Sequence, residues 1–283
     1  ITDFLRVHLP KERGFSTNTC EAYAHAFRIY FEFVAKQLSK KPSQIVLEDL
    51  DAKMVLDFLS DIEKRRRNSA STRNSRLAAI KAFMRFVEFK RPSALAQAAQ
   101  ILAIASKRHD QPLIKHLTIS EVNGILNAPD LSTRLGIRDR AMLHVCFAGG
   151  LRVSELVELP LERLSLNQSA SIRIVGKGRR ERCLPLWKET AKDIRAWVSV
   201  RGLVTAPELF VNADGTAMTR AGFEYILDKH VKATSMKVPS LKDRNITPHQ
   251  LRHSCALVML QATRDIRKVS LWLGHADLRT TEL

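Results

Sequence analysis

An arginine and a glutamate stand three residues apart in the segment Gly150-Leu151-Arg152-Val153-Ser154-Glu155. On a helix, this spacing puts Arg152 and Glu155 on the same face. A carboxylate in that position orients the guanidinium and leaves its other N–H groups available for an anion. Taken alone, the pattern also describes an ordinary surface ion pair, which is the commoner case.

A second candidate site lies in Thr247-Pro248-His249-Gln250-Leu251-Arg252-His253. Thr247 is typical of a helix cap and Pro248 of the first helical position. His249 and Arg252 then share the first turn, where free amides and the helix dipole favour an anion such as a phosphate. The spacing of His249 and His253 also suits a metal, but the zinc-protease pattern HExxH has glutamate where Gln250 stands, so no metal is expected. His253 itself is interpreted as a core or solvated histidine.

The third motif is Gly176-Lys177-Gly178-Arg179-Arg180, flanked by the apolar-rich runs Ser171–Val175 and Arg182–Leu186. This arrangement predicts a β-hairpin with Lys177 at its turn, from which a lysine can reach a ligand. The order of residues differs from the phosphate loop GxxxxGK[ST], and no helix is expected to follow. Farther along, Gly274 is predicted to end a helix just before His275.

The charge of the chain indicates a polyanionic partner. Its 283 residues hold 46 Lys and Arg against 29 Asp and Glu, a formal net charge of +17. Residues 1–110 contain 20 basic and 12 acidic side chains, and residues 111–283 contain 26 and 17, so both parts are basic. A basic protein without a nucleic-acid partner remains the alternative on charge alone.

Residues 1–105 are predicted to be helical, since apolar residues recur every three or four positions within 16–36, 50–62 and 72–89. The helix over 72–89 combines an apolar side with a basic side, which suits DNA phosphates or equally a solvated surface. Its candidate DNA contacts are Arg73, Arg76 and Lys81. Residues 106–116 are polar, contain Pro112 and are predicted to form a linker.

The second domain is predicted over 117–283, with a helix start at Thr118 or Ser120, a helix over 139–148 and the hairpin. Its candidate DNA contacts on predicted loops are Arg179, Arg180, Lys242 and Arg244. The four cysteines are scattered, so neither a zinc ribbon nor a disulfide framework is expected, which fits a reducing cytoplasm. No signal peptide and no long apolar run is present, so membrane insertion is not expected.

The ordered set of Arg152, Lys177, His249-x-x-Arg252 and Gly274-His275 resembles the catalytic domain of the tyrosine recombinase (phage integrase) family. The similarity is strongest to the Xer branch and to integrases of bacterial mobile elements. It implies a mainly α fold with a small antiparallel β-hairpin or sheet. It also implies a C-shaped, two-domain DNA clamp that joins a helical, SAM-like core-binding domain to an α+β catalytic domain.

The same resemblance implies roles for individual residues. Arg152 and Arg252 would hold the scissile phosphate, with Glu155 supporting Arg152. His249 and His275 would give hydrogen bonds and move protons, and Lys177 would protonate the leaving 5′-oxygen. A tyrosine would attack to form a 3′-phosphotyrosyl link, without metal, ATP or another cofactor. The implied partners are double-stranded DNA and a homotetramer on two duplexes, with a monomer or weak dimer in the absence of DNA, at the nucleoid.

The resemblance also implies a tyrosine nine residues after His275, at position 284, whereas the sequence ends at Leu283. Its three tyrosines are Tyr23, Tyr30 and Tyr225, none of them in that window, so the chain as it stands is not expected to cleave DNA. The chain begins with Ile1 rather than Met, which indicates trimming. The alternatives are a non-catalytic DNA-binding remnant that occupies recombination sites and, more remotely, a type IB topoisomerase.

Overall fold

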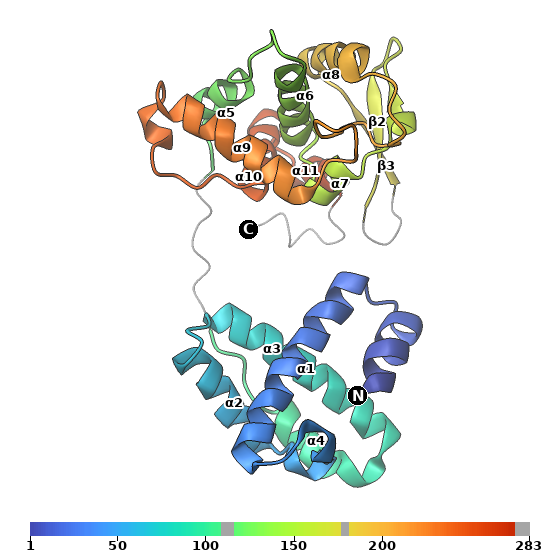
Figure 1. Ribbon diagram of the computed structural model, residues 1–283, viewed down its shortest axis with the longest axis vertical. Helices are drawn as coiled ribbons and strands as arrows, with labels where there is room; N and C mark the ends of the chain where they lie inside the picture. The colour runs from blue at the N-terminus through green and yellow to red at the C-terminus, as the bar shows by residue number, and fades with distance from the viewer. Residues whose placement is uncertain (109–115, 177–180, 275–283) are drawn as a thin grey trace. The chain divides into compact units, whose positions relative to one another are not determined.

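The computed structural model describes residues 1–108, 116–176 and 181–274, and the chain divides into two compact units, Ile1–Pro112 and Leu113–Leu283 (Figure 1). The boundary falls within the predicted linker at 106–116. Each unit has a hydrophobic core of its own.

The first unit is helical throughout its described elements, as predicted. Its three longest helices are α1 (Thr17–Leu38), α2 (Ala52–Lys64) and α3 (Ala70–Lys90), each close to its predicted range. Their N-caps are Ser16, Asp51 and Ser69, whose side chains accept a hydrogen bond from the amide three residues on. The shorter elements are η1 (Phe4–Glu12, a π-helix), η2 (Pro42–Gln44), η3 (Leu47–Asp49), η4 (Pro92–Ala94) and α4 (Leu95–Leu102).

Aromatic rings fill the core of this unit. Phe4 from η1 packs edge-on against Phe27 and Phe83, and Tyr30 packs against Phe58 with ring centroids 4.9 Å apart. Edge-to-face packing adds to the free energy gained by burying these rings. The core therefore ties η1, α1, α2 and α3 into one body.

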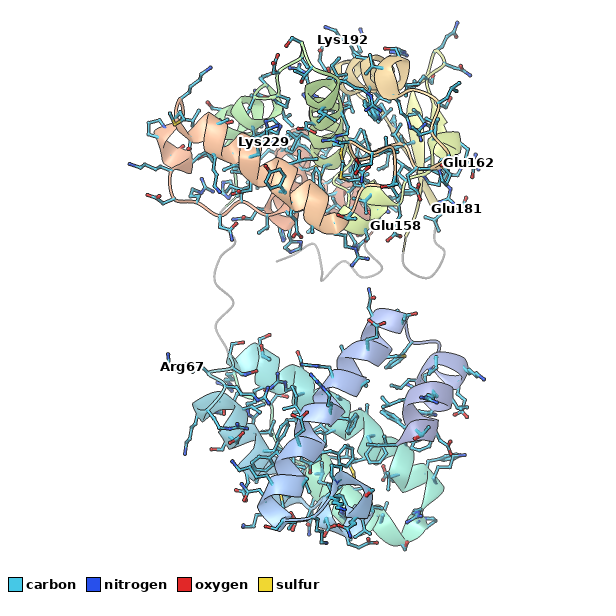
Figure 2. All side chains as sticks on the ribbon, in the orientation of Figure 1. Arg67, Glu158, Glu162, Glu181, Lys192 and Lys229 are labelled. Atoms are coloured by element: carbon cyan, nitrogen blue, oxygen red, sulfur yellow. The ribbon has the colours of Figure 1, made fainter. Side chains whose placement is uncertain are left out.

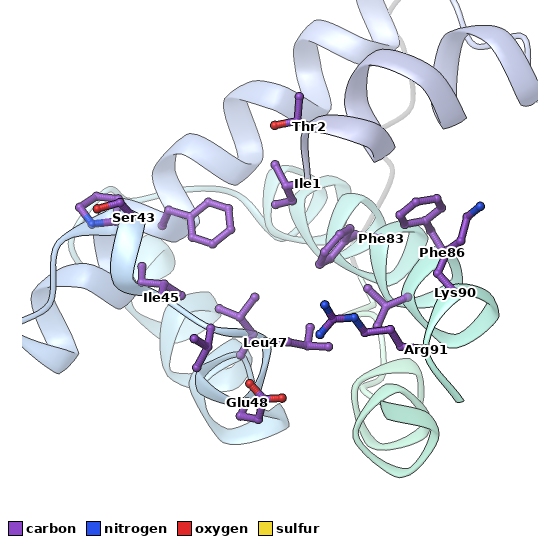
Figure 3. Close-up of a pocket in the computed structure, with 15 residues that line it drawn as sticks. Ile1, Thr2, Ser43, Ile45, Leu47, Glu48, Phe83, Phe86, Lys90 and Arg91 are labelled. Atoms are coloured by element: carbon purple, nitrogen blue, oxygen red, sulfur yellow. The ribbon is translucent and has the colours of Figure 1, made fainter. Parts of the chain in front are cut away.

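A hollow of about 800 Å³ opens in the first unit beside these rings (Figure 3). Its lining is mainly apolar and comes from Ile1, from the segment that contains η2 and η3, and from the C-terminal half of α3, which contributes Phe83 and Phe86. None of the residues predicted to bind DNA or to react lines this hollow.

The second unit combines helices with a small antiparallel sheet. The predicted hairpin is confirmed as β2 (Ser171–Val175) and β3 (Glu181–Pro185), with Ile174 opposite Arg182, and a short strand β1 (Leu164–Ser165) extends the sheet in the order β1-β2-β3. The helices are α5 (Ile119–Leu126), α6 (Arg134–Ala148), α7 (Val153–Val157), α8 (Lys188–Arg201), α9 (Arg220–Ser235), α10 (Pro248–Thr263) and α11 (Ile266–Leu273), with 3₁₀ turns η5 (Leu161–Arg163) and η7 (Pro239–Leu241).

Helix α6 is the central helix of the second unit, since most of its residues are buried and it packs against both α8 and α10 (Figure 1). Its last turn ends at Gly149, directly before the Arg152 motif. The position of that motif therefore depends on the packing of α6. None of the helices in the described ranges combines the length and apolar character needed to cross a membrane.

A buried ion network fixes α6 to α9. The Asp139 carboxylate, only 1% exposed, accepts hydrogen bonds from Arg138 (2.7 Å) and from the His230 ring (2.9 Å). The Lys229 amine lies 3.6 Å from the same carboxylate, with its side chain partly exposed (Figure 2). Burial alone would raise the pKa of Asp139, but the hydrogen bonds from His230 and Arg138 outweigh it and lower that pKa.

We expect Asp139→Asn to lower the free energy of unfolding of the second unit by about 3 kcal/mol, because it leaves the buried Arg138 charge unpaired. The matched control is Asp228→Asn, which removes the exposed pair with Lys232 and should cost less than about 1 kcal/mol. Guanidinium unfolding followed by tryptophan fluorescence measures both, because Trp187, Trp197 and Trp272 all lie in the second unit. Since the pKa of Asp139 is depressed on folding, its contribution is present at neutral pH and is lost as the pH falls through that pKa. Equal losses in the two variants at pH 7 would contradict this account.

Candidate functional site

Glu155 lies at the centre of a group of arginines. Its carboxylate accepts a hydrogen bond from Nη1 of Arg152 (2.9 Å) and another from the Arg152 backbone N–H (3.0 Å). The second of these bonds caps α7, because Arg152 is the residue that precedes it. The Glu155 side chain is 6% exposed, while that of Arg152 is 40% exposed. Arg152 is therefore anchored at one nitrogen and presents its other N–H groups to solvent, as the spacing of the two residues predicted.

Arg252 is held by backbone carbonyls in the interior. It lies in the first turn of α10, is 5% exposed, and donates from Nη1 to the carbonyl of Gly150 (2.5 Å) and from Nη2 to that of Leu273 (2.7 Å). Its Nη1 is also 3.8 Å from the Glu155 carboxylate. A guanidinium has five N–H groups, so these two bonds fix its plane and leave other donors for a ligand.

Gly150 allows close packing at the end of α6. Its φ of +54° is one that side chains rarely adopt, and an added Cβ would lie 2.5 Å from Leu273 and 3.3 Å from the Cys255 sulfur. The glycine that precedes the Arg152 motif therefore serves the packing of α10 and α11 onto the end of α6.

The two histidines of the α10 motif contact each other. The Nε2 atoms of His249 and His253 are 2.9 Å apart, so one ring donates and the other accepts. Thr247 caps the helix as predicted, since its hydroxyl accepts from the Gln250 amide and the Gln250 side chain accepts from the Thr247 amide. His253, interpreted from the sequence as a core or solvated residue, is thus the hydrogen-bond partner of His249.

Burial and charge shift the protonation of this site. Burial and then the neighbouring Arg152 lower the pKa of Arg252 to about 10, so the group stays charged at neutral pH. Burial alone would raise the pKa of Glu155, but hydrogen bonds from Arg182 and from the Arg152 amide keep it low. Burial, followed by the charges of Arg252 and Arg152, lowers the pKa of His249, which makes this ring neutral at pH 7. The site thus combines positive charge with a neutral imidazole able to accept a proton.

Several predicted residues fall outside the described part of the chain. They are Lys177, Arg179, Arg180 and His275. The structure places the base of the hairpin and the end of α11 next to the arginine group, through Arg182 and Leu273 respectively. The predicted roles of these four residues remain predictions.

Two basic residues predicted to contact DNA from the first unit are instead engaged within it. Arg73 is 5% exposed and donates to the carbonyl of Ala105 (3.4 Å), and Lys81 donates to that of Leu102 (2.7 Å). The reason is that α4 and the residues after it cover this side of α3. Arg76 is only partly buried, and its Nη1 has no hydrogen-bond partner among the described residues.

The two predicted loop contacts of the second unit differ from each other. Lys242 is exposed. Arg244 donates to the Glu121 carboxylate (2.8 Å), which ties the segment before α10 to α5, and its side chain is 24% exposed. Within the described ranges, no group of three or more His, Cys, Asp and Glu side chains is placed to hold a metal ion.

Sequence reasoning did not single out Arg182, which donates from both terminal nitrogens to Glu155 (3.2 and 2.9 Å). A signal existed: strand alternation puts Arg182 on the same face as Leu184, and that face is buried. A charged residue on the buried face of a strand needs a partner, and Glu155 is that partner.

We expect the imidazole of His249 to titrate below its ordinary midpoint of about 6.5, because burial and then the charges of the two arginines disfavour its protonated form. Arg152→Gln should move this midpoint upward, whereas Arg173→Gln, a change on the exposed face of β2, should leave it in place. Proton NMR titration of the free protein measures both, with His249→Asn to assign the resonance. A midpoint that does not respond to Arg152→Gln would contradict the proximity of the two side chains.

Comparisons with known proteins match both units of the chain to one family. Residues 115–283 match the phage integrase family, and residues 1–89 match the N-terminal SAM-like domain of phage integrases. A putative integrase/recombinase of Sinorhizobium fredii is 38% identical over 283 residues, covering 100% of this chain and 85% of the relative. Tyrosine recombinase XerC of Pelobacter propionicus is 33% identical, covering 98% and 87%.

Two solved structures have a similar fold. The XerH site-specific recombinase bound to its difH substrate gives a TM-score of 0.71 at 24% identity, over 93% of this chain and 75% of that one. The Tn1549 transposon integrase bound to transposon end DNA gives 0.72 at 16% identity, over 98% and 92%. From the family matches and the relatives above 30% identity over nearly the whole chain, we conclude that this protein belongs to the phage integrase family of tyrosine recombinases.

Proposed function

We propose that this protein is a site-specific DNA recombinase that cuts and rejoins double-stranded DNA through a 3′-phosphotyrosyl intermediate. The observation that carries the proposal is the shared carboxylate of Glu155, which contacts Arg152 directly and lies 3.8 Å from Arg252. One carboxylate beside two forked cations leaves a net positive site that suits a phosphate. Membership of the family supplies the reaction type.

In this mechanism, the donors that Arg152 and Arg252 do not use internally bind the non-bridging oxygens of the scissile phosphate. Their charge stabilises the five-coordinate transition state, in which negative charge on those oxygens increases. The neutral ring of His249 accepts the proton of the attacking hydroxyl, and its bond to His253 orients it. Lys177 gives a proton to the 5′-oxygen as its bond to phosphorus breaks, and His275 adds a hydrogen bond to the phosphate.

The nucleophile in this proposal is a tyrosine at position 284. Among the tyrosines of the sequence, Tyr30 is 1% exposed in the core of the first unit and Tyr225 is exposed on α9. Neither follows the α11 motif that precedes the nucleophile in the family. We therefore propose that residues 1–283 alone bind DNA without cleaving it. Neither metal nor ATP is required, because the phosphotyrosyl bond keeps the energy of the broken phosphodiester.

Both units would contribute to DNA binding, since both are basic. We assign phosphate contacts to Arg76, Arg179, Arg180 and Lys242, with a lesser share for Arg244, whose guanidinium is paired with Glu121. The active assembly in this proposal is a homotetramer on two duplexes, and a monomer or weak dimer without DNA. It acts on DNA at the nucleoid, in the cytoplasm.

The chain expressed with the codons that follow Leu283 in its gene should form a covalent adduct with DNA that carries its site, visible on a denaturing gel. Changing the tyrosine at position 284 to phenylalanine should abolish the adduct. Arg152→Gln should slow its formation by roughly 10²- to 10³-fold, because one donor to the transition state is lost. Arg173→Gln is the matched arginine control and should react normally.

Tight DNA binding without any adduct, or a gene without tyrosine at position 284, would favour a non-catalytic protein that occupies recombination sites. Loss of the adduct in Arg173→Gln to the same extent as in Arg152→Gln would contradict the assignment of the phosphate to Arg152.

DNA affinity should fall steeply with salt, because each neutralised phosphate releases counterions. Lys242→Gln should reduce the slope of log Kd against log salt by about 1. Lys232→Gln, an exposed lysine on α9 paired with Asp228, is the control and should not change it. Fluorescence anisotropy at several salt concentrations measures these slopes, and equal slopes for all three proteins would remove Lys242 from the interface.

A further inference from the structure

Arg182 enters the site from the sheet. Along β3, Arg182 and Leu184 face inward, whereas Glu181, Cys183 and Pro185 are exposed. The Arg182 guanidinium donates from Nη1 and Nη2 to the two carboxylate oxygens of Glu155. Its side chain is 11% exposed. It therefore reaches the same carboxylate as Arg152, but from strand β3.

Arg182 also occupies the space beside the end of α11. Gly274 has φ +66°, and a Cβ added there would lie 2.7 Å from Nη1 of Arg182 and 3.2 Å from its Cδ. One residue earlier, the Leu273 carbonyl accepts the hydrogen bond from Arg252. The backbone that leads to His275 is thus held between two arginines, and glycine at position 274 is what permits the contact with Arg182.

The contacts of Arg182 differ from those of Arg152. Both of its terminal nitrogens are committed to Glu155, and the remaining Nε is buried and without a hydrogen-bond partner among the described residues. Arg152, by contrast, uses one side-chain nitrogen on Glu155 and is 40% exposed. Of the three arginines around Glu155, Arg182 is the one whose two terminal nitrogens both donate to that carboxylate.

Stability alone is a poor reason for such a residue. A buried ion pair often contributes no more to stability than apolar side chains of similar volume would. A strand position beside Leu184 on the inward face would ordinarily take an apolar residue. The fork of Arg182, however, fixes both oxygens of Glu155. Oε1 then accepts from the Arg152 guanidinium and Oε2 from the Arg152 amide in a set orientation.

We propose that Arg182 is a positioning residue for DNA cleavage, which orients Glu155 for Arg152 and seats the Leu273–Gly274 backbone that precedes His275. The inference rests on the proposed function. It predicts that Arg182 affects the rate of the chemical step and leaves the affinity for DNA almost unchanged, because the proposed phosphate ligands are Arg152 and Arg252.

The test compares Arg182→Met, Arg182→Lys and the control Arg173→Met, which removes an arginine from the exposed face of the same hairpin. Single-turnover adduct formation should fall roughly 100-fold in Arg182→Met, because the reacting groups are misplaced. Arg182→Lys keeps the charge but not the fork, so its rate should lie between those of Arg182→Met and the parent protein. The Kd for DNA should change less than about threefold in every variant, since all of the phosphate ligands remain. Arg173→Met should react like the parent.

Two further readouts separate positioning from a general loss of folding. Removing Arg182 takes away the hydrogen bonds that lower the pKa of Glu155. The acid limb of the rate profile should therefore move to higher pH, whereas partial unfolding would lower the rate without moving that limb. In a Glu155→Gln background, Arg182→Met should slow adduct formation much less than in the parent, because both changes remove the same Arg182–Glu155 interaction. Fully additive losses, or an unmoved acid limb, would overturn the inference.

A failure of the recombinase proposal can be distinguished from a failure of the Arg182 inference. If the parent chain, extended past Leu283, forms no adduct, the recombinase proposal fails and not the role of Arg182 at Glu155. A carbon-13 NMR titration of the Glu155 carboxyl in the free protein then decides the inference. Its midpoint should rise in Arg182→Met and stay in place in Arg173→Met, and an unmoved midpoint in Arg182→Met would overturn the inference.

Discussion

One buried carboxylate organises the site. Glu155 is 6% exposed and lies within 4 Å of the guanidinium groups of Arg152, Arg182 and Arg252. A carboxylate so deeply buried is stable only if it is paired, and three neighbouring guanidiniums are stable only if their repulsion is reduced. The carboxylate is therefore well paired, but its single negative charge offsets only part of the repulsion among the three guanidiniums. A net positive charge remains, which an incoming phosphate would neutralise.

Several elements supply the groups that surround Glu155. The carboxylate caps α7 through the Arg152 amide, receives Arg182 from β3 and lies near Arg252 from α10. Arg252 in turn bonds to the carbonyls of Gly150 and Leu273, which mark the ends of α6 and α11. Four helices and a hairpin, some of them more than a hundred residues apart along the chain, therefore meet at one ionic group. A change at any of these contacts is expected to reach the others.

The helices were predicted well from the sequence where their apolar periodicity extends over several turns. Helices α1, α2 and α3 were found because apolar residues recur at helical spacing over many turns, and the Thr247–Pro248 start of α10 was found from its capping residues. Helix α4, with 8 residues, and the two-residue strand β1 were too short to show a period. The region of α4 was predicted to be helical but without bounds of its own, and this affected the site prediction. Its end and the residues after it bind Lys81 and Arg73, which looked like free basic residues on α3.

The site itself was predictable only in part. The candidate residues Arg152, Glu155, His249 and Arg252 were identified from local motifs, and the structure brings them together. The contacts that join the motifs are long-range, such as Arg182 to Glu155 and Arg252 to Leu273, and no local spacing encodes them. The bond between His253 and His249 was not predicted, because two side chains four residues apart on a helix meet only in some rotamers.

The most direct test of this account is a crystal structure of the protein bound to a duplex that carries its recombination site. In this complex we expect one DNA phosphate with non-bridging oxygens about 3 Å from nitrogens of both Arg152 and Arg252. Arg182 should keep its two bonds to Glu155. A phosphate bound by Arg182 in place of Arg152, or a Glu155 carboxylate turned away from the arginines in the complex, would contradict it.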